Sequence, residues 1–362
     1  MKTFSLKKNI ALGAAVAALA FTSNLLAQVP VFIEGGSASQ SVLYDRATNL
    51  FAGAPITVTG AASSAVRRFV GTSANPALTG YGQITLDINV NNGAIAGLQA
   101  LVNQSAGPGD TNILGVPTVP TFVDSATSPE AVGIDSVAAN LTAYPTYVVP
   151  LVYIKNTSSL DTANITNLTQ RQAVSLETST NQARYFGGNS TNQIFFIGRN
   201  KNAAVRTEID LNIYQSGNIQ TYQTNALGQP VRDLSADPGL SAGGAVTATV
   251  QVLTNAIGTV AVQNIKSGTA AIAYEGVPYS AANVINGSYP LWGYENYYFI
   301  ASGTGSPTGP QQAVIDVFYQ SVTNAAFQAQ TGGVFTNNFI PNSALRVSRD
   351  FDGGQIKALP NY

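Results

Sequence analysis

Apolar residues along the chain alternate between short continuous runs and segments with helical spacing. The run Val29 to Glu34 (VPVFIE) is typical of a buried strand and ends in a Gly/Ser/Ala turn. The next apolar positions repeat with helical spacing on one face: Val42, Leu43, Ala47 and Leu50. The pattern therefore predicts a strand, a tight turn of small residues and a helix.

The same alternation continues along most of the chain. Further strands are predicted at Ile56 to Thr59, Ile84 to Val90, Thr118 to Val123, Tyr147 to Ile154, Ile194 to Ile197, Ile257 to Val262 and Tyr297 to Ile300. Helices are predicted at Gly93 to Val102, Ile165 to Leu176 (capped by Thr166 or Asn167), Val205 to Tyr214, Val246 to Leu253 and Ala313 to Ala326. Strands that alternate with helices favour an α/β fold with crossover helices.

Three of the strand-to-helix turns share one physical design. They are Ser37–Gln40, Asn92–Ala94 and Arg199–Arg206, and Asp124-Ser125 ends a fourth strand. The start of a helix presents unpaired N–H groups and the positive end of the helix dipole, so several starts aimed at one cleft would form an oxyanion receptor. Each turn alone also has an ordinary backbone explanation, and the two arginines could equally be surface charges.

The N-terminus predicts export. Lys2, Lys7 and Lys8 precede an apolar stretch from Ile10 to Phe21, and Ala27 offers a small residue for cleavage. The alternative is a membrane anchor, but the stretch is shorter than the ~20 residues that a span needs. We therefore expect a signal peptide at residues 1–27 and a periplasmic or extracellular mature protein without a membrane span.

Composition removes several functional classes. The chain has 362 residues, 45% hydrophobic and only 10% charged, whereas soluble domains typically have roughly 25% charged residues. Its length predicts two domains. It has no cysteine and no histidine, which excludes disulfides, the common zinc sites and a Ser-His-Asp triad. We expect no cofactor and no metal, and the lack of a basic excess argues against a nucleic-acid partner.

Seven segments in collinear order resemble the phosphate-type branch of the class II periplasmic solute-binding proteins of ABC importers. They lie within residues 31–325 and read IEGGSASQSVLYDRATNLF, LDINVNNGAIAGLQAL, VPTFVDSATSPEAV, YVVPLVYIKNTSSLDTANITNLTQRQ, IFFIGRNKNAAVRTEID, GGAVTATVQVLTNAIGTVAV and NGSYPLWGYENYYF. The first is similar to that family's opening strand and Gly/Ser/Thr loop, and the last to its Gly-x-Tyr-Pro-Leu signature.

The resemblance implies a two-lobed α/β fold, each lobe a mixed sheet flanked by helices. Two crossing segments, near residues 143–150 and 270–290, would join the lobes. Residues 28–143 and 290–362 would form lobe I, and residues 144–289 would form lobe II. A ligand at the lobe interface would then close a hinge.

The resemblance also implies a set of ligand contacts. Asp124 would be the cleft carboxylate and Arg199 the charged clamp, with the remaining contacts from Ser39, Gln40, Asn92, Gly93, Ser125, Ala203, Ala204, Val205 and Arg206. The chain departs from the family because Ala203-Ala204-Val205 stands where Ser-Gly-Thr is usual, so two hydroxyl donors are missing. Arg206 would offset that loss if it turned inward.

These features predict a monomeric receptor that binds inorganic phosphate or a similar oxyanion and delivers it to an ABC permease at the inner membrane. A second reading is a structural or interaction protein on the same fold that has lost its ligand, which the low charge and the missing hydroxyls favour. An enzyme is a third reading, and it is disfavoured because no paired carboxylates stand at an informative spacing.

Overall fold

The structure is a computed structural model that describes residues 28–215 and 217–360. The predicted signal peptide lies outside the described residues. Thirteen strands of the described chain form one continuous mixed sheet: β1 (Val29–Gly35), β2 (Ile56–Thr59), β3 (Val66–Gly71), β4 (Ile84–Asn89), β5 (Phe122–Ser125), β6 (Leu141–Asn156), β7 (Asn167–Leu168), β8 (Asn181–Gln182), β9 (Gln193–Ile197), β12 (Ala256–Ala261), β13 (Thr269–Tyr274), β14 (Trp292–Ile300) and β15 (Ile340–Pro341).

Helices cover both ends of this sheet. The α-helices are α2 (Gln40–Leu50), α3 (Ala94–Asn103), α4 (Gln170–Thr178), α5 (Ala204–Asn212), α6 (Gly243–Val252), α7 (Ala281–Ile285), α8 (Gly309–Thr323) and α9 (Ala325–Gln328). Short 3-10 helices lie at Pro76–Leu78, Glu130–Val132, Ala183–Phe186, Val262–Asn264 and Asn342–Ala344. Two small hairpins are formed by β10 (Tyr222–Thr224) with β11 (Pro230–Arg232) and by β16 (Val347–Ser348) with β17 (Lys357–Ala358).

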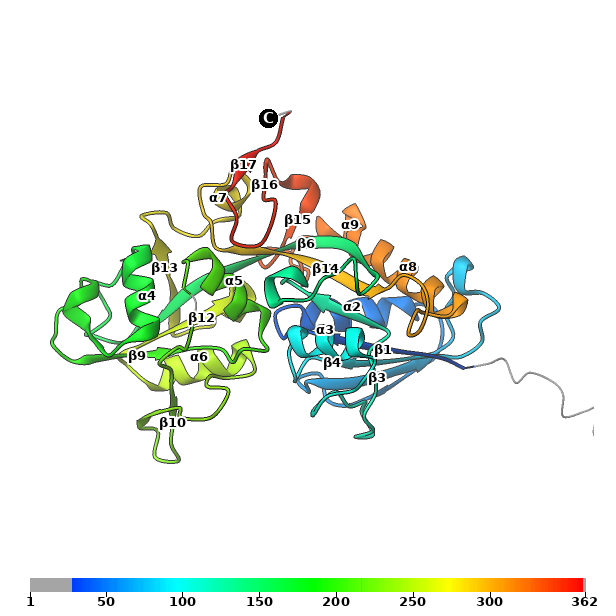
Figure 1. Cartoon of the computed structure of the whole chain (residues 1–362), viewed down its shortest axis with the longest axis horizontal. Helices are drawn as coiled ribbons and strands as arrows, with labels where there is room; N and C mark the ends of the chain where they lie inside the picture. Colours follow the sequence, from blue (N-terminus) through cyan, green and yellow to red (C-terminus); the bar gives the residue numbers. More distant parts are fainter. Residues whose placement is uncertain (1–27, 216, 361–362) are drawn as a thin grey trace, which may run out of the picture.

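The molecule has two lobes, at the two ends of the sheet (Figure 1). The strand order is β2-β3-β4-β1-β5-β14-β6-β12-β9-β8. In the first lobe β1 pairs in parallel with β4 and β5, and α2, α3 and α8 pack on this part of the sheet. In the second lobe β12 pairs in parallel with β9 and antiparallel with β6, and α5 and α6 pack on it. This is the expected mixed α/β architecture.

Strand β6 connects the two lobes. Its first part pairs antiparallel with β14, with Pro150 opposite Trp292, and its last part pairs with β12 and β13. The predicted apolar strand from Tyr147 to Ile154 is the buried centre of β6. A crossing segment was expected near residues 143–150, within this strand. The lobe boundaries at residues 143/144 and 289/290 stay a prediction.

One helix start was predicted wrongly. The helix expected from Ile165 begins five residues later, and Thr169 is its N-cap. The hydroxyl oxygen of Thr169 accepts a hydrogen bond from the backbone N–H of Gln172, whose side chain accepts one from the backbone N–H of Thr169. This reciprocal capping box fixes the start. Neither Thr166 nor Asn167 caps the helix, because Asn167 begins β7, which pairs with β13.

Other differences are smaller. The strand predicted from Thr118 begins only at Phe122, as β5. The predicted late helix is interrupted at Asn324, which has an extended backbone. The side chain of Asn324 caps α9 by accepting a hydrogen bond from the N–H of Phe327. Strands β3 and β13 were not predicted. Among the described residues no helix has both the length and the apolar character that a membrane crossing requires.

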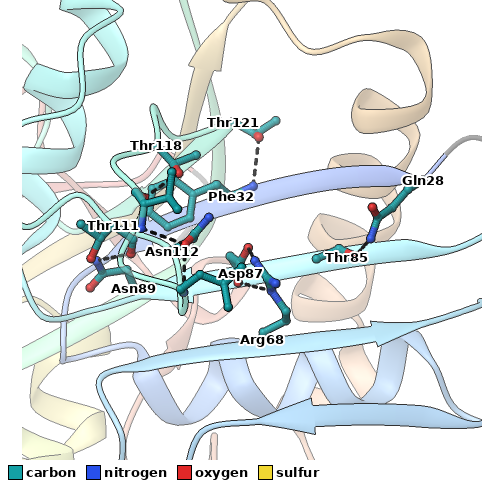
Figure 2. A network of polar contacts seen from close by, with 12 residues as sticks. Gln28, Phe32, Arg68, Thr85, Asp87, Asn89, Thr111, Asn112, Thr118 and Thr121 are labelled. Carbon is teal, nitrogen blue, oxygen red and sulfur yellow. Dashed lines mark hydrogen bonds and ion pairs between the residues drawn. The ribbon is translucent and has the colours of Figure 1, made fainter.

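A polar network fixes the long loop between α3 and β5 against the first lobe (Figure 2). The side-chain amide of Asn89 donates to the carbonyl oxygens of Gly109 (2.9 Å) and Thr111 (3.0 Å). At the other end of the loop the backbone N–H of Phe32 donates to the hydroxyl of Thr121 at 3.0 Å. The loop is thereby held close to the carboxyl ends of β1 and β4, where the candidate site lies.

Candidate functional site

Arg199 follows the end of β9 and is almost fully buried, with 2% of its surface exposed. Its guanidinium donates to the carbonyl oxygens of Leu240 (Nε, 2.9 Å) and Ser241 (Nη2, 2.6 Å) and, across the lobe boundary, to the hydroxyl of Ser37 (Nη2, 3.3 Å). Its Nη1 atom has no hydrogen-bond partner among the described residues. Burial lowers the pKa of Arg199 to about 10, so the group remains a cation at neutral pH without a carboxylate partner.

Ser37 joins the starts of two helices from opposite lobes. Its hydroxyl oxygen also accepts a hydrogen bond from the backbone N–H of Gly243, the first residue of α6, at 3.3 Å. Its carbonyl oxygen accepts one from Nε2 of Gln263 at 3.1 Å, and Oε1 of Gln263 accepts one from Ser41 in α2 at 3.0 Å. The starts of α2 and α6 therefore meet beside Arg199.

The second predicted turn also reaches the opposite lobe. Gly93 has a φ of 92°, and a Cβ atom there would lie 2.3 Å from the carbonyl oxygen of Asn202. Only glycine allows this approach. The backbone N–H of Ile95, in the first turn of α3, donates to the same Asn202 oxygen at 3.3 Å. One amide of the α3 start is thus occupied by a carbonyl group from the loop that leads into α5.

Asp124 is the last residue but one of β5 and is completely buried. Neither of its carboxyl oxygens accepts a hydrogen bond from an N–H or hydroxyl group among the described residues. Burial raises the pKa of Asp124 to about 7, while the nearby side chains of Ser39 and Glu295 act to lower it. The Ser39 hydroxyl itself donates to the carbonyl oxygen of Gly36 at 3.1 Å. Arg199 and Asp124 therefore both adjoin the turn that opens α2, through Ser37 and Ser39 respectively.

The remaining predicted residues divide between the interface and local roles. Ala203, Ala204 and Val205 are buried at the start of α5, and the Ala204 carbonyl accepts a hydrogen bond from the hydroxyl of Thr127 in the loop after β5, at 3.3 Å. The Ser125 hydroxyl donates to the carbonyl oxygen of Thr127 at 2.9 Å. These residues fix the lobe contact next to Asp124.

Two predicted side chains bond within the first lobe. Gln40 donates to the carbonyl oxygen of Ser64 at 3.0 Å, and Asn92 donates to the carboxylate of Asp110. Asn92 nevertheless lines a groove of about 600 Å³ between the lobes, together with Asp110, Lys201, Asn202 and Asp237. The groove thus extends to the start of α3 and is wide enough to hold water.

Arg206 does not offer the second guanidinium that would offset the missing hydroxyls. Its Nε atom pairs with Asp210 one helical turn further along α5, at 3.3 Å, and its Nη2 atom donates to the carbonyl oxygen of Gly217 at 3.4 Å. The i to i+4 spacing puts both charges on one helix face. Arg206 is thereby directed into its own lobe, away from the contacts of Arg199.

Sequence reasoning missed part of the interface. Ser37 was predicted only as part of the turn Ser37–Gln40, and the contacts missed altogether are Leu240, Ser241, Gly243 and Gln263, with Glu295 beside Asp124. A signal was present in the pair Gly243-Gly244, which opens a helix in the same way as the three turns that were singled out. Two of the three partners of Arg199 could not be found because they are backbone carbonyl groups, which any residue supplies.

Comparison with known proteins supports this architecture. No established family profile and no curated protein matches the sequence. A solved structure from Clostridium perfringens, assigned as a phosphate ABC transporter substrate-binding protein with bound phosphate, is similar at 16% identity and a TM-score of 0.56. The similarity covers 86% of this chain and 99% of that one. An ABC-type phosphate transport receptor from Vibrio cholerae shows 14% identity over 80% and 93% of the two chains, with a TM-score of 0.49.

At these identities the similarity establishes the fold. The chain has the two-lobed mixed α/β architecture of the type II periplasmic binding proteins. The Clostridium perfringens structure is that of a substrate-binding protein. What this chain itself binds has to be argued from its own residues.

Proposed function

We propose that this protein is a solute-binding protein that captures a small oxyanion, with phosphate as the first candidate, between its two lobes. The observation that carries the proposal is the buried Arg199 guanidinium, whose Nη1 atom has no partner among the described residues. Burying a cation without a counter-charge is unfavourable. An oxyanion would supply both the missing charge and the missing acceptor, and a guanidinium binds phosphate in bidentate fashion.

The surroundings of Arg199 suit a tetrahedral anion. Helices α2, α3, α5 and α6 all begin at the lobe interface, and their first N–H groups favour negative charge. On the other side of the turn that opens α2, no donor group of the described residues forms a hydrogen bond with the carboxyl oxygens of Asp124. As a carboxylate it would accept a hydrogen bond from a protonated phosphate oxygen and repel a fully deprotonated anion such as sulfate.

The proposed role is transport. The signal peptide expected at residues 1–27 would export the chain, and the mature monomer would deliver its ligand to an ABC permease at the inner membrane. Residues 28–143 with 290–362, and residues 144–289, would be the two bodies that close around the anion. The fold shared with phosphate-binding proteins supports this role.

A second function has its own support. Two interlobe contacts already use groups that an anion would need: Asn202 occupies one amide at the start of α3, and Ser37 accepts the N–H of Gly243. Together with Ala203-Ala204-Val205, which lack hydroxyl groups, these contacts favour a structural or interaction protein that keeps its lobes together without a ligand. In that case a closed molecule would bind no anion.

Isothermal titration of the purified mature protein with phosphate, and separately with sulfate, distinguishes the two functions. The receptor predicts saturable binding of one phosphate per chain, tighter than that of sulfate. Absence of heat up to millimolar phosphate, with the protein shown to be folded by its thermal transition, rejects phosphate as the ligand. Light scattering that reveals self-assembly at sub-micromolar concentration would favour the structural function.

A further inference from the structure

Asp124 belongs to a buried polar cluster on one region of the sheet. In the pairing of β5 with β14 it lies directly opposite Tyr297, and in the pairing of β14 with β6 Glu295 lies opposite Tyr147. The four side chains are at most 1% exposed. The pairing of β14 with β6 shifts register between Glu295 and Asn296, which leaves Thr146 of β6 as the extra residue of a bulge.

The cluster contains several polar atoms without hydrogen-bond partners. Both oxygens of Asp124 and the hydroxyl groups of Tyr147 and Tyr297 have no hydrogen-bond partner among the described residues. Glu295 lies two residues before Tyr297, the cross-strand neighbour of Asp124, and the interaction of the two carboxyl groups lowers the pKa of Asp124 and raises that of Glu295. Two carboxyl groups can bond only when one of them keeps its proton, and two buried like charges in contact are strongly unfavourable.

Groups on the surrounding elements decide which carboxyl keeps the proton. Burial first, and then the charge of Asp124, raises the pKa of Glu295 well above its ordinary value, and the carboxyl of Glu208 in α5 adds to the shift. Ser39, the N-cap of α2, lowers the pKa of Asp124, and Arg46 in α2 lowers that of Tyr297.

The remaining charged groups influence the Asp124–Glu295 pair only through Glu208. Arg349 and Asp352 of the C-terminal tail act on Glu208 and not directly on the pair. Among the described residues, no cation contributes to the pKa shift of Asp124 or of Glu295. Above about pH 7, where Asp124 ionises, the proton that remains in the pair therefore resides on Glu295, and the pair carries one negative charge on Asp124.

We propose that Glu295 is a positioning residue that donates its retained proton to Asp124 and thereby keeps Asp124 an acceptor for a protonated oxyanion. This inference rests on the proposed function, and it assigns to Glu295 the choice between phosphate and sulfate. No bond is made or broken. The proton stays on Glu295 and is shared in a hydrogen bond, while the free oxygen of Asp124 faces the ligand.

Loss of this donor predicts a change of specificity. In Glu295→Leu the lowering effect of Glu295 on the pKa of Asp124 is lost while that of Ser39 remains, so the pKa rises further and a larger fraction of Asp124 is protonated at neutral pH. A protonated Asp124 donates a hydrogen bond. The site would then bind sulfate as well and would no longer prefer a protonated anion. In Glu295→Gln the amide N–H replaces the carboxyl O–H, so the preference should be retained.

The test is calorimetric titration of the intact protein, Glu295→Gln and Glu295→Leu with phosphate and with sulfate, from pH 5.5 to 8.5. We expect the phosphate-to-sulfate affinity ratio at pH 7 to fall at least about tenfold in Glu295→Leu, about 1.4 kcal/mol, and to stay within about threefold in Glu295→Gln. Unchanged ratios in both variants would overturn the inference while leaving the proposed function intact. No binding by the unaltered protein would overturn both.

A ligand-free measurement covers the case in which Glu295→Leu fails to fold. Infrared spectroscopy at pH 7 separates protonated from ionised carboxyl groups. The near-isosteric Glu295→Gln should remove one protonated carboxyl signal from the spectrum of the intact protein. If it removes an ionised carboxylate signal instead, Glu295 is not the donor and the inference is wrong.

Discussion

The Nη2 atom of Arg199, in the second lobe, donates a hydrogen bond to the hydroxyl oxygen of Ser37, in the first lobe, at 3.3 Å. This contact joins the end of β9 to the turn that opens α2. Because the same Ser37 oxygen accepts the first N–H of α6, it stands where an anion would meet both a guanidinium and a helix start. An arriving phosphate would replace this 3.3 Å contact with a neutral hydroxyl by a stronger one in which both partners are charged.

Replacement of Arg199 should abolish tight anion binding. A hydrogen bond to a charged group contributes about 1.5–3 kcal/mol, so loss of two such bonds in Arg199→Met should weaken phosphate binding about a hundredfold or more. The matched control is Arg184→Met, which removes an exposed arginine that lies over Tyr185 in the second lobe. Calorimetry should show the loss only in the first variant, and equal affinities in the two would remove Arg199 from the site.

Gly93→Ala should prevent full closure of the lobes. The new Cβ would lie 2.3 Å from the Asn202 carbonyl oxygen, so the loop before α5 must move away. Gly80→Ala is the control, because Gly80 also has a positive φ (101°) but has no atom within 4 Å of the Cβ position. Both variants carry similar backbone strain, of about 1–3 kcal/mol.

Small-angle X-ray scattering reads out this difference. The radius of gyration should increase in Gly93→Ala and not in Gly80→Ala. Phosphate affinity should fall along with closure, because closure brings the first and second lobes to the same ligand. A Gly93→Ala protein as compact as the unaltered one would show that the contact with Asn202 does not hold the lobes.

Stability of the ligand-free protein should fall as pH rises from 5 to 9. Burial raises the pKa of Glu34 from 4.5 to about 10, that of Asp124 from 3.8 to about 7 and that of Asp210 from 3.8 to about 6. The folded state therefore binds these protons more tightly than the unfolded state. The resulting stability is complete below the unfolded pKa values and is lost as pH rises through the folded ones.

Each such group contributes a slope of up to about 1.4 kcal/mol per pH unit within its own window. Thermal unfolding in phosphate-free buffer should give the highest melting temperature near pH 5. A melting temperature that is constant or rises between pH 5 and pH 9 would contradict the assignment of these carboxyl groups as buried acids.

Ala203→Ser should strengthen phosphate binding. Ala203 is the N-cap of α5 and has no side-chain cap, so a serine hydroxyl there can bond either the helix or a ligand at the helix start. As a ligand contact it should tighten binding about tenfold or more. As a cap alone it should raise stability by about 1 kcal/mol without changing the affinity, and that result would place the ligand elsewhere.

The periodic part of the fold could be predicted from the sequence because its signals are local. Val42, Leu43, Ala47 and Leu50 are all buried on one face of α2, as their spacing predicts, and β2 has the predicted bounds. The start of α4 could not be read correctly, because the pairing of Asn167 with β13 depends on a strand about a hundred residues further along the chain.

The candidate site shows the same limit. The three turns were found because small and polar residues at helix starts leave a trace in the sequence, and the structure brings all three to the lobe interface. The direction of an individual side chain leaves no such trace. Arg199 and Arg206 belong to the same turn, yet one meets Ser37 of the other lobe and the other pairs with Asp210 of its own helix.

Crystallography with arsenate, a tetrahedral analogue of phosphate with an anomalous signal, tests the central claim most directly. The account predicts one anomalous peak per chain, within hydrogen-bonding distance of the Arg199 guanidinium and beside the turn that contains Ser37. A fully occupied peak elsewhere, or none at millimolar arsenate in a folded and diffracting protein, would contradict it.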